Sequence, residues 1–213
     1  MKLTIFGATG TIGTHLVKKA LQHGHQVTAF ARHPQVLLDD PLLNNQPNLS
    51  LLAGDVLNPT AVSDAIKDSD AVLITLGSKK LSGDVRSAGT RNIVQAMEQH
   101  QVKRLICQST LGAGDSWTNL NLFWKTLMFG FFLRQVFKDH ELQERTVQHS
   151  NLDWTIVRPA SFTDEGPTDR YKSGFSATEK NLTLKISRQD VAHFMLLQLT
   201  DNTYLKQTPG LSY

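Results

Sequence analysis

The chain has 213 residues, of which 40% are hydrophobic and 19% charged, and its formal net charge is +3. This length supports one domain with a proper core, and the weak, scattered positive charge argues against nucleic acid as a partner. The single cysteine, Cys107, excludes an internal disulfide, fits a reducing compartment and is expected to pack in the core. Strand-forming sequence begins at residue 2 with no secretory leader before it, so we expect a cytoplasmic protein.

A short apolar strand at Leu3 to Phe6 is followed by glycines at positions 7, 10 and 13 and by a helical pattern from His15 to His23. A strand that breaks on glycines into a helix leaves free backbone N–H groups at the positive end of the helix, where a pyrophosphate can bind. In this arrangement Gly7 permits the tight turn, Gly10 lets the backbone approach phosphate and Gly13 lets the helix pack on the strand. The G-x-x-G-x-x-G spacing therefore predicts a dinucleotide site, with an ordinary β–α turn as the alternative.

A second strand, Gln26 to Ala31, ends at Arg32. In a βαβ dinucleotide unit, the end of this strand lies beside the adenosine ribose. An arginine there binds a 2′-phosphate through charge-assisted hydrogen bonds worth about 1.5–3 kcal/mol. Arg32 therefore predicts NADP(H) rather than NAD(H); the alternative is a solvated surface arginine.

The third strand, Leu49 to Ala53, leads into Asp55 and Val56. At this edge of a doubly wound sheet, Asp55 is expected near the adenine amino group and Val56 against the ring. Capping of the next helix is an equal alternative for Asp55, although Asn58, which precedes a proline, makes a better helix start.

The fourth strand, Asp70 to Leu76, is an almost unbroken apolar run, which predicts a central parallel strand buried on both faces. Gly77 to Lys80 follow at its carboxyl end, over the expected cofactor. Lys79 or Lys80 contacts phosphate in this interpretation; a solvated loop charge is the alternative.

After a helix from Ser87 to His100 and a strand from Lys103 to Cys107, Ser109 and Thr110 lie at the carboxyl end of the strand. Ligands of such sheets bind outside the carboxyl ends of the strands. These two adjacent hydroxyls are therefore candidates for holding nicotinamide or substrate. Loop capping is the alternative for Ser109.

The segment Leu120 to Phe137 is strongly apolar. Its uninterrupted part, Leu127 to Leu133, is far shorter than the roughly 20 residues that span a bilayer, and Lys125 and Arg134 flank it. We expect a buried or substrate-covering helical segment. A dimer contact and docking on a membrane surface are the alternatives.

The remaining elements complete the alternation of strands and helices. We expect a helix over 138–148, a strand over 153–157, a turn over the sheet top at 158–162, a substrate-flanking loop over 163–180, a strand over 182–186 and a helix over 191–199. Ser187 is expected to cap the last helix, with Asp190 completing a capping box.

This pattern predicts an α/β fold with a Rossmann-type doubly wound parallel sheet. One NAD(P)-binding domain is expected over 1–213, with a small C-terminal substrate-side portion and substrate-side elements mainly at 111–137 and 158–186. The eight histidines form no His-Glu-x-x-His pattern, so no metal site is expected.

Three motifs carry a family resemblance: Gly-Ala-Thr-Gly-Thr-Ile-Gly at 7–13, Gly-Asp-Val at 54–56 and Leu-Asp-Trp-Thr-Ile-Val-Arg-Pro at 152–159. Together they resemble the atypical short-chain dehydrogenases/reductases, the NmrA-like NAD(P)H-binding proteins. Within this group the chain looks most like the flavin reductases, also called biliverdin-IXβ reductases. The terminal stretch Ile186 to Leu196 is the more specific link.

The resemblance implies roles for individual residues. The phosphate contacts fall on Gly7, Thr9, Gly10, Thr11 and Ile12, the 2′-phosphate contact on Arg32, the adenine contacts on Asp55 and Val56, the remaining cofactor contacts on Leu76, Gly77 and Lys79, and the nicotinamide contacts on Ser109 and Thr110. The family's substrate-side serine falls on Thr110, so the hydroxyl is kept. The family's histidine in the substrate loop falls on Ser161, which favours flavin over tetrapyrrole reduction.

The chain lacks the Tyr-x-x-x-Lys pair that protonates a carbonyl oxygen in ordinary short-chain dehydrogenases, because Phe175 and Thr208 follow Tyr171 and Tyr204 at that spacing. Hydride transfer to a flavin does not need the pair. We therefore expect an NADPH-dependent reductase of FMN, riboflavin or a similar conjugated acceptor such as biliverdin or a quinone.

In this hypothesis the catalytic hydroxyls of Thr110 and Ser109 orient the rings, and Leu111, Trp117 and Phe162 form apolar walls of a substrate site that also includes Ser161. The alternative is a non-catalytic NADP(H)-binding redox sensor or assembly factor. Apart from the small-molecule substrate no partner is specified, and we expect a monomer, with a dimer as the alternative.

Overall fold

The computed structural model describes residues 1–77, 83–122, 125, 133–179 and 181–213. The strands are β1 (Lys2–Phe6), β2 (Gln26–Ala31), β3 (Leu49–Ala53), β4 (Ala71–Ile74), β5 (Arg104–Gln108), β6 (Asp153–Pro159), β7 (Ser161–Thr163), β8 (Lys172–Ser173), β9 (Lys185–Ser187) and β10 (Gly210–Ser212). The α-helices are α1 (Gly13–Gln22), α2 (Pro59–Ile66), α3 (Val85–Gln99), α4 (Arg134–Gln148) and α5 (Arg188–Leu197), and the 3₁₀ helices are η1 (Pro34–Asp39) and η2 (Gly114–Asn119).

Eight strands form one sheet in the order β3-β2-β1-β4-β5-β6-β10-β8. The pairs from β3 to β6 are parallel, β10 joins β6 in parallel, and only β8 runs antiparallel to its neighbour. The strands β7 and β9 form a separate parallel pair. The order 3-2-1-4-5-6 is that of the doubly wound dinucleotide-binding sheet, so the predicted Rossmann-type fold is confirmed.

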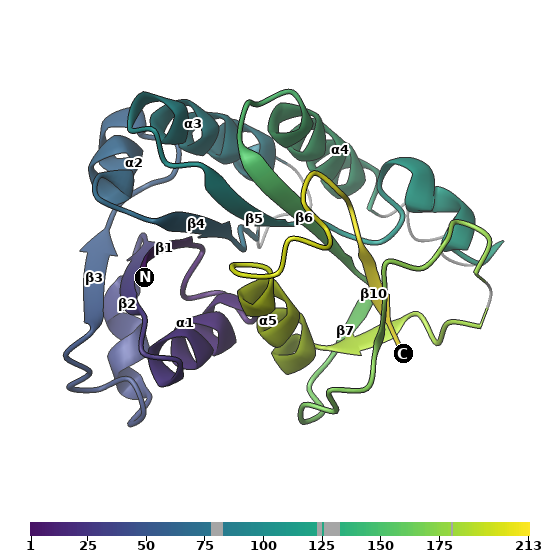
Figure 1. Cartoon of the computed structure of the whole chain (residues 1–213), viewed down its shortest axis with the longest axis horizontal. Helices are drawn as coiled ribbons and strands as arrows, with labels where there is room; N and C mark the ends of the chain where they lie inside the picture. The colour runs from purple at the N-terminus through teal and green to yellow at the C-terminus, as the bar shows by residue number, and fades with distance from the viewer. Residues whose placement is uncertain (78–82, 123–124, 126–132, 180) are drawn as a thin grey trace.

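Helices cover both faces of the sheet. Figure 1 shows α2, α3 and α4 along one face and α1 with α5 against the other. The side chains of β4 alternate between the two cores: Ala71 and Leu73 pack on the side of α1 and α5, and Val72 and Ile74 on the side of α2 and α3. Both faces of β4 are therefore buried, as its unbroken apolar run predicts.

Helix α2 is capped by Asn58, the residue that the sequence favours as its start. The side chain of Asn58 accepts hydrogen bonds from the backbone N–H groups of Thr60 and Ala61, and Pro59 takes the first helical position. The carboxylate of Asp55 instead accepts the N–H of Leu57 at 2.9 Å, within the turn before the helix. The helix-capping alternative for Asp55 is therefore wrong. Cys107 is fully buried in the core, as predicted.

The chain after β6 differs from the sequence-based expectation. The strand continues through Arg158 to Pro159, because the N–H of Arg158 donates to the carbonyl of Pro209 in the segment that leads into β10. Residues Ser161–Thr163 then form β7 instead of a turn over the sheet top. The strand β10 was not predicted, since three residues carry no readable alternation; it exists because β6 and β8 pair with it.

The last helix starts three residues earlier than predicted, and its capping box does not form. Ser187 caps α5 by accepting the N–H of Gln189 at 3.1 Å. Asp190 turns away from the cap and binds the loop and the chain end, where it accepts hydrogen bonds from Thr168, from the N–H of Asp169 and from the hydroxyl of Tyr213. Burial would raise the pKa of Asp190, but these hydrogen bonds outweigh it and hold the pKa below its usual value.

We expect Tyr213→Phe to lower the free energy of unfolding by about 1.5–3 kcal/mol at neutral pH, measured in urea. The variant removes a 2.6 Å charge-assisted bond to Asp190 and also leaves the N–H of Ser187 without the phenolic oxygen that accepts it at 3.0 Å. Because the carboxylate pKa is depressed in the folded protein, the stabilisation is present above the unfolded pKa of about 3.9 and is lost as the pH falls through the folded value.

Tyr204→Phe is the matched control, since among the described residues its hydroxyl pairs with the neutral hydroxyl of Ser173 alone, at 3.1 Å. This variant is expected to lose about 1 kcal/mol or less, with little dependence on pH. Equal losses in the two variants would show that the carboxylate adds nothing to the bond.

Candidate functional site: a dinucleotide turn beside an apolar pocket

The glycine turn after β1 is held by contacts from both neighbouring strands, β2 and β4. The N–H of Gly7 donates to the carbonyl of Phe30 on β2 at 3.2 Å, and the hydroxyl of Thr75, which follows β4, lies 3.2 Å from the carbonyls of Phe6 and Gly7. Gly7 has φ +80°, and a Cβ there would lie 2.5 Å from the carbonyl oxygen of Thr75. The turn thus requires glycine for its backbone angle and for its contact with β4.

The N-terminus of α1 has neither a capping side chain nor an acidic residue of its own. The residue at the cap position, Ile12, makes no side-chain capping bond, and the first turn contains no acidic residue. Thr9 and Thr11 are exposed around this helix end, while Ile12 is buried beneath it. Burial and the positive charges of Lys18, Lys19 and Arg188 lower the pKa of His15, which lies in the first helical turn. The arrangement suits an anion such as a diphosphate.

The residues predicted at the adenosine end lie at the same edge of the sheet. Arg32 follows β2 directly, and Asp55 and Val56 come two and three residues after β3. Arg32 and Asp55 are exposed, and Val56 is 7% exposed. The parallel register of β2 and β3 keeps these positions close to the glycine turn.

Val56 and Leu76 converge on one face of α3. A Cβ built on Gly89 of that helix would lie 2.8 Å from the methyl groups of Val56 and 3.1 Å from Leu76. Gly77, the next residue, is exposed, and no atom lies within 4 Å of where its Cβ would be. Lys79 and Lys80 lie outside the described residues, so their predicted phosphate contact stays a prediction.

The two hydroxyls at the carboxyl end of β5 have different surroundings. Ser109 is 1% exposed, and its Oγ has no hydrogen-bond partner among the described residues. The Ser109 hydroxyl therefore makes no loop-capping hydrogen bond with these residues. Thr110 is half-buried, and its hydroxyl makes only a long 3.4 Å contact with the carbonyl of Leu111. The Thr110 hydroxyl is thus available to a ligand in the pocket, whereas the Oγ of Ser109 is buried without a partner among the described residues.

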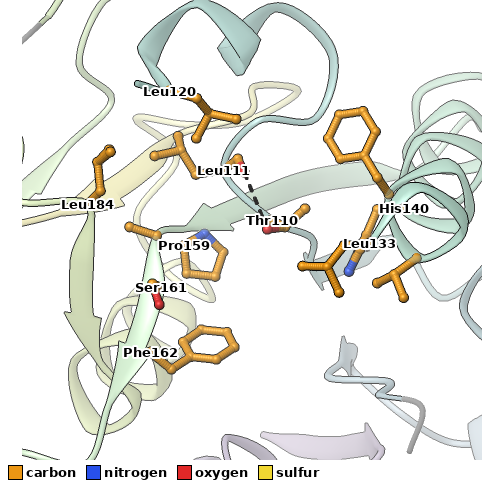
Figure 2. A pocket seen from close by; sticks show the side chains of 12 residues that line it. Thr110, Leu111, Leu120, Leu133, His140, Pro159, Ser161, Phe162 and Leu184 are labelled. Atoms are coloured by element: carbon orange, nitrogen blue, oxygen red, sulfur yellow. Dashed lines mark hydrogen bonds between the residues drawn. The ribbon is translucent and has the colours of Figure 1, made fainter. Parts of the chain in front are cut away.

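An apolar pocket of about 220 Å³ opens beside Thr110. It is lined by Thr110, Leu111, Leu120, Leu133, Val136, Phe137, His140, Pro159, Ala160, Ser161, Phe162 and Leu184. In Figure 2, Leu133 and His140 face Pro159, Ser161 and Phe162 across the pocket, with Thr110 between the two sides. One wall thus comes from α4 and the other from β6 and β7.

Of the six residues predicted to orient or surround the acceptor rings, Thr110, Leu111, Ser161 and Phe162 meet in this pocket, whereas Ser109 does not line it. Trp117 does not line it; its ring packs against Phe137, with the ring centres 5.5 Å apart, and Phe137 forms part of the wall. The apolar segment 120–137 contributes Leu120, Leu133 and the start of α4, whereas 123–124 and 126–132 lie outside the described residues. None of the helices in the described ranges combines the length and apolar character that a bilayer crossing requires.

His140 is the pocket residue that the sequence-based analysis missed, and it is the sole titratable group among these lining residues. It is 6% exposed, and burial, together with the nearby Arg86 cation, lowers its pKa to about 3. A hydrogen bond with Gln143 and the charge of Asp139 act in the opposite direction but are weaker. The imidazole is therefore neutral at physiological pH.

Asp139 connects α4 to the start of α3. Its carboxylate accepts the backbone N–H groups of Arg86 and Ser87 at 3.1 and 2.9 Å, and one oxygen lies 3.5 Å from the Arg86 guanidinium. The side chain of Asp84, at the cap position of α3, makes no capping bond, so Asp139 serves as the cap from another helix. These bonds from Asp139 to Arg86 and Ser87 fix α4, and with it His140, relative to α3.

The family model described as NAD(P)H-binding matches residues 7–202 of this chain. The chain belongs to this NAD(P)H-binding family. The match spans the glycine turn, both walls of the pocket and α5, so the family covers the whole candidate site of this NAD(P)H-binding protein.

Two relatives represent the sequence matches. Protein YMR090W of Saccharomyces cerevisiae is 28% identical over 221 residues, which cover 99% of this chain and 92% of the yeast protein. The Photosystem II assembly factor Ycf39 of a Synechocystis species is 22% identical over 98% of this chain but 61% of its own length. This chain thus spans less than two thirds of Ycf39.

Two solved structures share the fold. A short-chain dehydrogenase/reductase of Veillonella parvula in complex with NADP has a TM-score of 0.83 at 19% identity, covering 100% of this chain and 94% of its own. ChuY of Escherichia coli, described as an anaerobilin reductase, has a TM-score of 0.80 at 24% identity, covering 100% and 97%. The family match confirms the predicted NAD(P)H-binding character, and the two structures share the predicted fold.

Proposed function

We propose that this NAD(P)H-binding protein is an NADPH-dependent reductase whose acceptor is a flat conjugated ring, with FMN or riboflavin as the first candidates. The observation that carries the proposal is the apolar pocket at the carboxyl ends of β5 and β6. Only β4 separates β5 from β1, the strand that leads into the glycine turn. A nicotinamide whose diphosphate occupies the turn reaches this edge of the sheet in folds of this type. The pocket then receives the ring beside it.

The residues of the turn fit the cofactor. We propose phosphate contacts for Gly7, Thr9, Gly10, Thr11 and Ile12, adenine contacts for Asp55 and Val56, and contacts along the rest of the cofactor for Leu76, Gly77 and Lys79. The uncapped end of α1 and the glycine that permits close approach support this assignment. When bound, NADPH supplies the hydride that the conjugated acceptor takes up.

The pocket favours a ring that needs no acid from the protein. Its described lining contains no Tyr, Lys, Asp or Glu, and its one titratable side chain is a neutral histidine. A ketone or alcohol substrate needs a proton donor at its oxygen, whereas a flavin spreads the charge over its rings. The protein therefore acts by proximity: apolar walls hold the acceptor, Thr110 and Ser109 orient the rings, and water is excluded.

Purified protein mixed with NADPH and FMN tests the function directly. Loss of NADPH absorbance faster than in free solution supports the reductase. The second candidate, a non-catalytic NADP(H)-binding sensor or assembly factor, is favoured by the likeness to Ycf39. Tight NADPH binding with no turnover across flavins, biliverdin and quinones would support that alternative and contradict ours.

Arg32→Ala tests the proposed preference for NADP(H). Arg32 is exposed at the end of β2 and makes no hydrogen bond or ion pair with a described residue, so its loss is expected to leave stability unchanged. NADPH affinity should fall about 10- to 100-fold because charge-assisted bonds to the 2′-phosphate are lost, while NADH affinity changes little. Calorimetry with both dinucleotides measures the difference, and equal losses for the two would remove the 2′-phosphate assignment.

Thr110→Ala tests the proposed orientation of the rings. We expect kcat for FMN reduction to fall about tenfold while the dissociation constant for NADPH stays within about twofold, because one neutral hydrogen bond is lost on the acceptor side. Thr110→Ser keeps the hydroxyl and should restore most of the rate. A large loss of NADPH affinity in the alanine variant would instead assign this hydroxyl to cofactor binding.

A further inference from the structure

His140 enters the pocket from α4 as part of a regular stripe. Leu133, Val136, Phe137 and His140 follow one another at helical spacing, and all four line the pocket. The first three are apolar, so the imidazole is the one polar group on this wall. Figure 2 shows the ring extending toward the space beside Thr110 and Leu133.

A chain of buried side chains fixes the orientation of the imidazole. Its Nδ1 lies 3.2 Å from Oε1 of Gln143, and Nε2 of Gln143 donates to the hydroxyl of Thr90 on α3 at 3.1 Å. Gln143 and Thr90 are both fully buried. An amide oxygen can only accept a hydrogen bond, so Nδ1 carries the proton of the neutral ring. The lone pair of the ring is then on Nε2.

The Nε2 atom is open to the pocket. It makes no hydrogen bond with any described residue. It is also not one of the side-chain atoms that are both unpaired and fully buried, so it has accessible surface. Since the residue is 6% exposed and lines the pocket, the accessible part of the ring faces the cavity. An acceptor without a partner thus points at the place where the ring of the substrate is proposed to bind.

The surrounding charges keep this atom an acceptor. The groups that face the imidazole are the Arg86 cation, the Asp139 carboxylate and the Gln143 amide, and the cation and burial together dominate. The ring does not gain a second proton near neutral pH, so it cannot act as a proton donor through Nε2. Nε2 can therefore only accept a hydrogen bond from an N–H or O–H group.

We propose that Nε2 of His140 is a specificity-determining hydrogen-bond acceptor that receives an N–H or O–H from the edge of the conjugated ring in the pocket. This inference rests on the proposed function and narrows its substrate class. Oxidised flavins have one N–H on the ring system, at N3, whereas a para-quinone has none. A guest without a donor leaves a buried acceptor unpaired, and such a mismatch discriminates strongly between ligands. The pocket therefore favours flavin-type rings over quinones.

The test compares lumiflavin with 3-methyllumiflavin, which differ only in the N–H at N3. Binding is measured by flavin fluorescence quenching, in the presence of NADP⁺, on the wild type and on His140→Leu. We expect the wild type to bind lumiflavin about tenfold more tightly than the methylated analogue. In His140→Leu, lumiflavin affinity should fall to the level of the analogue, so that the preference disappears.

The direction of the change separates a hydrogen bond from a steric effect. If the methyl group merely collides with the imidazole, His140→Leu raises the affinity of the analogue and leaves lumiflavin unchanged, which overturns the inference. His140→Gln keeps an acceptor oxygen at a similar reach and should retain part of the preference. A purely structural role for the histidine would weaken both flavins equally.

Nitrogen-15 NMR of the wild type provides a measurement that needs no variant. The inference requires a protonated Nδ1 and an unprotonated Nε2 in the free protein, and a shift of the Nε2 signal when lumiflavin binds but not when the analogue binds. A proton on Nε2 overturns the inference even if His140→Leu fails to fold. A wild type that binds neither flavin overturns the proposed function together with the inference, whereas equal binding and reduction of both flavins overturns the inference alone.

Discussion

Gly13→Ala is expected to lower the affinity for NADPH about 100-fold, the effect of losing two charge-assisted hydrogen bonds of about 1.5 kcal/mol each. An added Cβ would lie 2.2 Å from the carbonyl oxygen of Gly7 and 2.9 Å from two backbone atoms of Ala8. These neighbours are backbone atoms, so no side chain can rotate away. The start of α1 must move off the turn, and the N–H groups proposed to hold the diphosphate move with it. The overpacking should also lower the free energy of unfolding by about 1–3 kcal/mol.

Gly166→Ala is the matched control. It is an exposed glycine, and no atom lies within 4 Å of where its Cβ would be. Its NADPH affinity and stability should equal those of the wild type. Calorimetry measures binding, and circular dichroism confirms that both variants are folded. Wild-type affinity in a folded Gly13→Ala protein would show that this turn does not hold the cofactor.

The sequence predicts the N-terminal half of the fold to the residue in places. The bounds of β2 (Gln26–Ala31) and β3 (Leu49–Ala53) agree with the predicted strands. These strands are apolar runs of five or six residues that end at turn signals, and the information that defines them is local. The C-terminal strands β8 and β10 have two and three residues each, and they exist only through pairing with a neighbour. Their definition is tertiary, so local patterns do not predict them.

In the candidate site too, the parts defined by local sequence were predicted and those defined by tertiary contacts were not. The glycine turn and the two hydroxyls after β5 follow from motifs at the ends of predicted strands. The predicted substrate-covering segment 120–137 includes Leu133, Val136 and Phe137 of the α4 wall. His140 was missed because the next helix was predicted to start at Lys138, whereas α4 runs without a break from Arg134. The stripe of Leu133, Val136, Phe137 and His140 was readable at helical spacing, but the apolar run before it obscured the period. The contact of Ser161 with the pocket depends on β7 pairing with β9, which no local pattern encodes.

Arg158→Leu is expected to lower the free energy of unfolding by about 3–5 kcal/mol and the melting temperature by about 10 °C. Arg158 is 3% exposed, and its guanidinium binds both oxygens of Glu144 at 3.0 and 2.7 Å and one oxygen of Asp115 at 2.5 Å. Burial opposes the charge of Arg158, but these carboxylates outweigh it and raise its pKa. Leucine fills part of the volume but leaves the carboxylate of Glu144, itself 3% exposed, buried without its partner.

The double variant Arg158→Leu with Glu144→Leu is the control, because removing both charges removes the unpaired ion. Replacing a whole buried pair by apolar residues is often neutral, so the double variant should recover most of the lost stability. A double variant as unstable as Arg158→Leu would show that lost packing, and not the unpaired carboxylate, causes the effect.

The pair also has a place in the proposed chemistry. Glu144 belongs to α4 and Arg158 to β6, the elements that carry the two walls of the pocket, and Asp115 ties η2 to the same guanidinium. The glycine turn, in contrast, is held by Phe30 on β2 and by Thr75, which follows β4. Arg158→Leu, assayed below its melting temperature, should therefore weaken flavin binding severalfold while NADPH affinity is retained. Equal losses of both would mean that the pocket and the turn move as one unit.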